Sequence, residues 1–105
     1  MNYDRYAYLF QCLANRSRLR LLELLAGYGE MSVSDIVSAF QGDGMDERET
    51  STISRNLGIL RQQGLVQVRR EGQWKYYRLN AETIDEVCVE FKRFLMEAPS
   101  RFETD

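Results

Sequence analysis

The stretch that decides the fold is TSTISRNLGILRQQGLVQVRREGQWKYYRL, residues 50–79. Its first part places Ile53, Leu57 and Leu60 at i, i+4 and i+7, which is the spacing of a narrow apolar stripe on an amphipathic helix. The helical pattern ends at Gly64, and the apolar period then changes to two. The stretch therefore predicts a helix followed directly by a β-hairpin.

The charged side chains of this stretch are mostly basic. Residues 50–80 hold six arginines and lysines against the single acid Glu71, a charge of +5, whereas the whole chain carries −2. Nucleic-acid binding depends on such local concentration, because each phosphate contact releases condensed counterions. Acidic side chains that lie farther from the DNA than one Debye length are screened by salt, so they weaken binding little. One face of an acidic protein can thus be strongly basic.

A short helix followed by a basic ribbon is typical of a winged helix-turn-helix, in which the helix enters the major groove of DNA. Side chains on its first turns reach base edges, and Arg55 is placed for a bidentate contact with guanine. Hairpin side chains lie on phosphates or enter the minor groove. The expected helix contacts are Thr50, Ser51, Thr52, Ser54, Arg55 and Arg61, and the expected wing contacts are Arg69, Arg70, Gln73 and Lys75.

Three helices are predicted before this unit and one after it. The segment 3–14 is apolar on most sides, more than one packing surface requires. Residues 15–17 offer N-cap oxygens to a leucine-rich second helix, and Ser32 with Asp35 forms a capping pair for the third. Asn80 caps the last helix, which Pro99 closes.

The length of 105 residues fits one domain, residues 1–98, with a tail at 99–105 that we expect to be flexible. The predicted class is mainly α with α+β character, in the order four helices, hairpin, helix. No apolar run approaches the roughly 18 residues needed to cross a bilayer, and the N-terminus does not read as a signal peptide. We therefore expect a cytoplasmic protein that does not contact membranes.

Two segments, LANRSRLRLLELL (residues 13–25) and the decisive stretch from Ser51 to Leu79, resemble the core of ArsR/SmtB repressors, and the similarity covers about residues 8–80. The resemblance implies a recognition helix at Ser51–Arg61, a wing at Leu65–Leu79 and a homodimer formed by the first and last helices. It also implies a repressor that leaves an inverted-repeat operator when an unknown inducer binds. The implied dimer residues are Tyr3, Tyr6, Phe10, Val87, Phe91, Phe94 and Leu95.

The chain departs from that family in its metal sites. Where the family's best-known metalloid site reads Cys-Val-Cys-Asp, residues 32–35 read Ser-Val-Ser-Asp, and hydroxyls do not replace thiolates for soft metals. The family's other site uses histidine on the last helix, and this chain has no histidine. Asp85, Glu86 and Glu90 offer only a weak oxygen site. We expect no metal and no cofactor.

The connector at 41–49, QGDGMDERE, is a second departure, because it is about six residues longer than a usual short turn. It places four acids beside a helix that is expected to meet DNA. Either the connector points away from the duplex, or Asp46, Glu47 and Glu49 stabilise the N-terminus of the helix through its dipole. We favour the second interpretation.

Cys12 and Cys88 are spaced neither as a disulfide framework nor as a C-x-x-C motif. Both are expected on helix faces that meet at the dimer interface, so a redox or thiol-reactive switch is conceivable, although packing as small apolar residues is the favoured interpretation. An apolar ligand pocket lined by the aromatic residues at positions 3, 6, 8 and 10 is a further alternative to interface packing. Trp74 is expected to pack on the core.

Two other functional classes are alternatives to a DNA-binding regulator. A protein-interaction module that reuses the winged fold would suit the net negative charge, and a gel-shift experiment separates it from a regulator. An enzyme is the weakest alternative, since the sequence shows no histidine, glycine-rich phosphate loop or ligand cluster.

Overall fold

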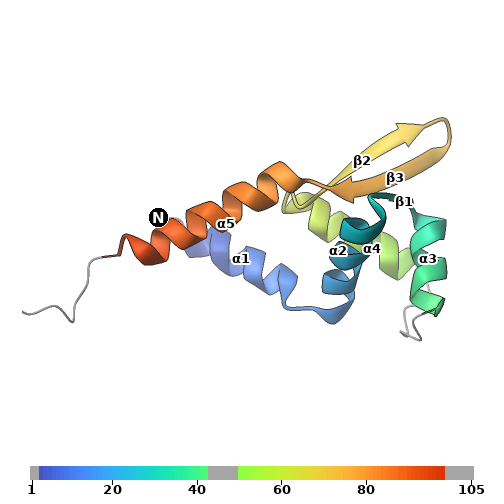
Figure 1. The fold of residues 1–105 in the computed structure, drawn as a ribbon. Coiled ribbons are helices and arrows are strands. Elements are labelled where there is room, and N and C mark those ends of the chain that lie inside the picture. The colour runs from blue at the N-terminus through green and yellow to red at the C-terminus, as the bar shows by residue number, and fades with distance from the viewer. Residues whose placement is uncertain (1–2, 43–49, 99–105) are drawn as a thin grey trace, which may run out of the picture.

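The computed structural model describes residues 3–42 and 50–98. Those residues form five helices and a small antiparallel sheet, whose hairpin projects from the helices (Figure 1). The elements are α1 (Tyr3–Leu13), α2 (Arg16–Tyr28), β1 (Glu30–Ser32), α3 (Val33–Gly42), α4 (Thr50–Gln62), β2 (Val66–Glu71), β3 (Trp74–Leu79) and α5 (Ala81–Met96). The predicted class and the order of helices and hairpin are confirmed. The tail at 99–105, Pro99 and the acids at 46, 47 and 49 lie outside the described residues.

The strand β1 is an addition to the predicted fold. It pairs with β3, so that the sheet has the order β1-β3-β2, and Met31 lies opposite Tyr77. Three residues are too few to show a period-two pattern in the sequence, and β1 exists only because β3 offers it a free edge. The strand fixes the start of α3 against the base of the hairpin.

The core lies between α2, α3, α4 and the inner face of the sheet. The three apolar residues of the predicted α4 stripe, Ile53, Leu57 and Leu60, are all buried in it. They meet Leu21 and Leu25 of α2, and Phe40 of α3 is the largest side chain that is completely buried. Because α4 buries little besides this stripe and Asn56, most of its remaining surface is open to solvent.

The predicted helix caps are confirmed. Asn15 Oδ1 accepts a hydrogen bond from a backbone N–H in the first turn of α2 at 2.9 Å, and Asn80 Oδ1 does the same for α5 at 3.3 Å. At α3, Ser32 Oγ accepts from the backbone N–H of Asp35 at 3.2 Å, and the Asp35 carboxylate accepts from that of Ser32 at 3.1 Å. This reciprocal pair is a capping box.

The junction between α4 and the hairpin is fixed by Gly64, which has φ +77°. The Leu65 N–H donates to the Leu60 carbonyl at 3.0 Å and the Gly64 N–H to the Arg61 carbonyl at 2.9 Å, the two bonds of a Schellman motif. The Leu65 carbonyl in turn accepts from Asn80 N–H at 2.9 Å, which closes the base of the hairpin. The end of α4 therefore sets where the hairpin begins.

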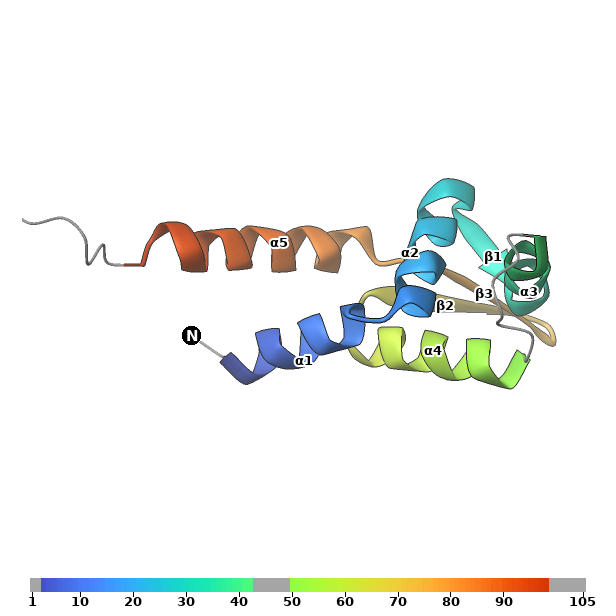
Figure 2. The same ribbon diagram turned by 90° about the horizontal axis from the view of Figure 1, so that it is seen from below.

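The helices α1 and α5 lie together at the opposite end of the molecule from the hairpin tip (Figures 1 and 2). Aromatic rings join them: Phe10 and Phe91 have centroids 4.8 Å apart, Tyr6 and Phe91 5.4 Å, and Tyr3 and Phe94 6.0 Å. In α5 only Val87 is buried. Among the described residues no helix is long and apolar enough to span a membrane.

Candidate nucleic-acid interface

The polar face of α4 is open over its whole length. Thr50, Ser51, Ser54, Arg55 and Arg61 are exposed, and Thr52, the sixth predicted contact, is half-buried. These positions follow from the packing, because the buried stripe on the other side of α4 turns them outward.

Two of the exposed cations share one side of α4. Arg55 and Arg61 line a shallow hollow together with Gly58, Ile59 and Gln62. Gly58 leaves this part of the helix without a side chain, and no atom of the described chain would meet a Cβ there within 4 Å. Neither arginine forms an ion pair with another described residue. Both charges are therefore available to an anion.

A buried polar contact that the sequence analysis missed holds α4 in place. Arg18, on α2, donates from Nη1 to Asn56 Oδ1 on α4 at 3.0 Å, and from Nε to the Cys12 carbonyl at 2.6 Å. Asn56 is one of the two buried polar residues among those described. Nothing local in the sequence indicates this contact, because its partners are 38 residues apart.

The two faces of the hairpin carry different chemistry. Directly paired residues share a face, and the pairs Val68–Tyr77 and Arg70–Lys75 follow one another on the side of the core. Beyond the core, Arg70 and Lys75 are exposed, and neither has an ion-pair partner among the described residues. These two predicted wing contacts, with exposed Gln73 in the turn, remain open.

Arg69 was predicted to contact DNA together with Arg70, but it lies on the opposite face and its guanidinium is already engaged. It donates to both carboxylate oxygens of Glu30, the shorter bond being 2.7 Å, and to Glu71 at 2.7 Å, and it lies 4.7 Å from the Tyr76 ring centroid. These hydrogen bonds raise the pKa of Arg69 and lower that of Glu30. Arg69 thus ties the hairpin to β1.

The prediction that Trp74 packs on the core is wrong. Trp74 lies at the first position of β3, paired with Glu71 beside the turn, and its side chain is exposed. The two-residue turn, with Gly72 at φ +61°, ends the hairpin well beyond the core. Aromatic residues favour burial, but at this position the fold offers no apolar surface to pack on.

The recognition elements lie at one end of the molecule. In both ribbon views the N-terminal end of α4 and the tip of the hairpin lie away from α1 and α5 (Figures 1 and 2). The first turns of a helix with an open polar face and the tip of a ribbon with exposed cations therefore lie at the same end of the described chain. That arrangement is what docking on a groove requires.

Comparison with known proteins agrees with this geometry. Residues 13–69 match the family model described as a helix-turn-helix domain. The crystal structure of Mycobacterium tuberculosis Rv0081 superposes with a TM-score of 0.66 at 33% identity, covering 90% of this chain and 89% of that one. The solution structure of Mycobacterium bovis Mb0332 superposes with a TM-score of 0.65 at 34% identity, covering 97% of this chain and 88% of that one. It is described as a homodimeric winged helix-turn-helix DNA-binding domain of a possible ArsR-family regulator.

This chain belongs to the ArsR family of winged helix-turn-helix transcriptional regulators. Among sequence relatives, the arsenic resistance transcriptional regulator ArsR1 of Pseudomonas putida is 40% identical over 74 residues. That match covers 70% of this chain and 53% of the relative, so the chain spans about half the length of ArsR1.

In this ArsR-family chain the place of the family's metalloid thiolates has a structural use. Ser32 and Asp35 form the capping box of α3, so their oxygens are bound to backbone N–H groups. Within residues 3–42 and 50–98 no group of three or more histidine, cysteine, aspartate or glutamate side chains is arranged to hold a metal ion.

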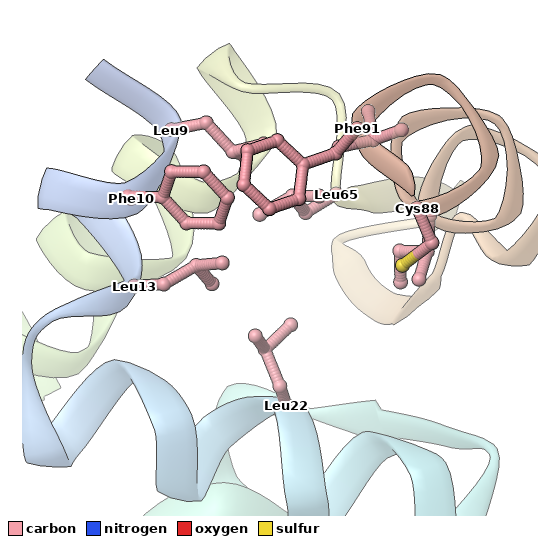
Figure 3. Close-up of a pocket in the computed structure, with 9 residues that line it drawn as sticks. Leu9, Phe10, Leu13, Leu22, Leu65, Cys88 and Phe91 are labelled. Carbon is pink, nitrogen blue, oxygen red and sulfur yellow. The ribbon is translucent and has the colours of Figure 1, made fainter. Parts of the chain in front are cut away.

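The two cysteines do not share a surface, which corrects the idea that they meet at one interface. Cys12 is buried in the core, and burial raises the pKa of its thiol although the Arg18 guanidinium acts in the opposite direction. Cys88 is exposed on α5 and lines an apolar cavity of about 170 Å³ with Phe10 and Phe91 (Figure 3). Of the four N-terminal aromatic residues proposed as a pocket lining, only Phe10 borders this cavity.

The predicted dimer residues divide into three groups by their exposure. Tyr6 and Val87 are buried within the chain, which corrects their assignment to an open interface. Tyr3, Phe10 and Leu95 expose large apolar surface on α1 and α5. Phe91 and Phe94 are half-buried, because each packs on α1 with one side only. The open apolar area is therefore a strip along both terminal helices.

Proposed function

We propose that this chain is a sequence-specific DNA-binding repressor that acts as a homodimer. The observation that carries the proposal is the combination of an exposed α4 face bearing Arg55 and Arg61 with a wing bearing Arg70 and Lys75, four cations that have no ion-pair partner among the described residues. The similarity to Mb0332, described as a homodimeric DNA-binding domain, supports it.

In the proposed complex the first turns of α4 lie in the major groove. Ser51, Ser54 and Arg55 reach base edges, with Thr50 and Thr52 beside them, while Arg61 contacts the backbone. Arg70, Gln73 and Lys75 extend from the wing to the adjacent groove and its phosphates. Arg69 has a different part, since its bonds to Glu30 and Glu71 orient the wing.

The homodimer is proposed from the apolar strip on α1 and α5. A domain of this size buries only about two-thirds of its unfolded surface, so covering Tyr3, Phe10 and Leu95 with a second copy adds usefully to its stability. A two-fold dimer presents two recognition helices, and its operator is then an inverted repeat.

The test is selection of binding sequences from a random duplex library, followed by sedimentation of the protein with and without the selected duplex. We expect an inverted repeat, bound by two chains, whose affinity falls steeply with salt. Failure to enrich any sequence at moderate salt would contradict the proposal and favour a protein-interaction module.

A further inference from the structure

The single tryptophan of the chain is the one large apolar side chain of the described wing that is exposed. Trp74 is the first residue of β3, next to the turn that Figure 1 draws at the upper right, and 52% of it is exposed. Within residues 3–42 and 50–98 its indole neither stacks on another ring nor lies under a cation. Apolar aromatic surface is thus left in water at the tip of the ribbon.

The cations that favour a polyanion lie on the other face of the ribbon tip, opposite this indole. Glu71, which pairs with Trp74 across the hairpin, has its carboxylate bound to Arg69 at 2.7 Å, and Arg69 shares its single charge between Glu71 and Glu30. Arg70 and Lys75 are the next pair along the ribbon and have no ion-pair partner among the described residues. Adjacent pairs point to opposite faces of the ribbon, so a groove that encloses the tip meets the apolar ring on one face and two cations without a described partner on the other.

We propose that the Trp74 indole is the wing's apolar contact with the minor groove of DNA, lying against deoxyribose rings while Arg70 and Lys75 contact the flanking phosphates. This inference rests on the DNA-binding function proposed above. The minor groove is about 6 Å wide, too narrow for a helix but open to a flat ring. Proteins that bind there often place apolar side chains against or between base steps, with basic side chains on the backbone.

The short turn fixes the position of Trp74 relative to the two strands. A two-residue loop with Gly72 at positive φ continues the twist of both strands, so the position of Trp74 is set by the sheet and not by a flexible loop. Arg69 makes the hairpin more rigid, because it holds β2 to Glu30 of β1. The ring is therefore presented with little loss of conformational entropy on binding.

The experiment uses the full chain and the selected duplex, with Trp74 as the only source of tryptophan emission. At saturation with duplex we expect acrylamide quenching of the emission to fall about twofold, because the contact covers one open face of the ring. Netropsin bound beforehand in the minor groove should reduce this protection. Unchanged quenching in a formed complex would overturn the inference while leaving the proposed function intact.

Substitutions separate an apolar contact from an electrostatic one. Trp74→Ala should weaken binding about tenfold, as expected for losing the burial of roughly half an aromatic side chain, with the slope of log K against log salt unchanged. Trp74→Phe should retain most of the affinity. Arg70→Ala should instead lower the slope, by about 0.9 for each phosphate that the arginine no longer neutralises.

The matched control is Tyr28→Ala. Tyr28 is also an exposed aromatic, 71% open, but it lies at the end of α2, and we expect no change in DNA affinity. Equal affinity of Trp74→Ala and the wild-type protein would overturn the inference. So would protection of the indole that rises with protein concentration in the absence of DNA, which would indicate a protein contact. If the wild-type protein binds no duplex, the proposed function fails first.

Discussion

Arg18 Nη1 on α2 lies 3.0 Å from Asn56 Oδ1 on α4 and donates a hydrogen bond to it. The same guanidinium donates through Nε to the Cys12 carbonyl at the end of α1. One side chain therefore links the end of α1 to the recognition helix through the core. Since only 8% of Asn56 is exposed, removing this donor leaves its amide oxygen with little access to water.

Removing the Arg18 guanidinium should loosen α4 from the rest of the core. We expect Arg18→Ala to lower the free energy of unfolding by about 1–3 kcal/mol, the cost of leaving a buried acceptor unsatisfied. Arg18→Lys should rescue little, because an ammonium lacks the fork that reaches both acceptors. Denaturant unfolding of Arg18→Ala, Asn56→Ala and the double variant gives the coupling free energy between the two side chains. Additive effects of the two substitutions would contradict a direct contact.

The alternation of side chains along β2 leads to a test of the wing. Arg70→Ala and Lys75→Ala should each lower the salt slope of DNA binding by about 0.9, whereas Arg69→Ala should change it little. The reason is that Arg69 already has Glu30 and Glu71 as anionic partners, and Arg70 and Lys75 have none among the described residues. Fluorescence anisotropy over a range of salt concentrations measures the slopes. An equal reduction for Arg69→Ala and Arg70→Ala would show that Arg69 leaves Glu30 on binding.

Arg55 should determine sequence preference. A bidentate contact with guanine is worth about 1–3 kcal/mol of discrimination against other bases, so Arg55→Ala should lose that preference while keeping most of its affinity for a scrambled duplex. Competition between the selected and scrambled duplexes measures the ratio. Gln62→Ala is the control, since Gln62 borders the same hollow but lies at the end of α4. A preference unchanged by Arg55→Ala would mean that other side chains select the sequence.

The parts of the fold that the sequence predicts are those with strong local signals. The α4 stripe, the caps at Asn15 and Asn80 and the capping box at Ser32 each depend on residues within a few positions of one another, and the structure confirms all of them. Such interactions are set by helix geometry alone. They suffice to position the recognition helix and the hairpin.

The parts of the fold that the sequence does not predict depend on contacts between distant segments. The Arg18–Asn56 bond and the β1–β3 pairing form only when the tertiary fold brings their partners together. Period-two alternation implies that Arg69 and Arg70 lie on opposite faces of the ribbon, a consequence that the prediction of both as DNA contacts overlooked. Because β1 was not predicted, however, Glu30 could not be recognised as the partner that occupies Arg69.

The open strip on α5 leads to a test of the homodimer. Leu95→Asp should raise the dimer dissociation constant strongly, because it places a charge on apolar surface that a second copy would cover. Leu19→Asp is the matched control, since the leucines are 53% and 51% exposed and Leu19 lies on α2. Sedimentation equilibrium measures both variants, with circular dichroism to check folding. Equal effects of the two changes would place the interface elsewhere.

The two thiols should differ in reactivity, and the difference reports on both the core and the dimer. With Cys88→Ser, only buried Cys12 remains, and we expect it to react with a disulfide reagent at least about tenfold more slowly than Cys88 does in Cys12→Ser. Because burial raises the pKa of Cys12, its thiolate fraction at neutral pH is small. Its rate should therefore keep rising with pH beyond the point at which the same thiol levels off in denaturant. If a second copy covers α5, the reaction rate of Cys88 should fall as protein concentration rises, while the reaction rate of Cys12 stays constant. A reaction rate of Cys88 that does not depend on protein concentration would mean that its side of α5 stays open.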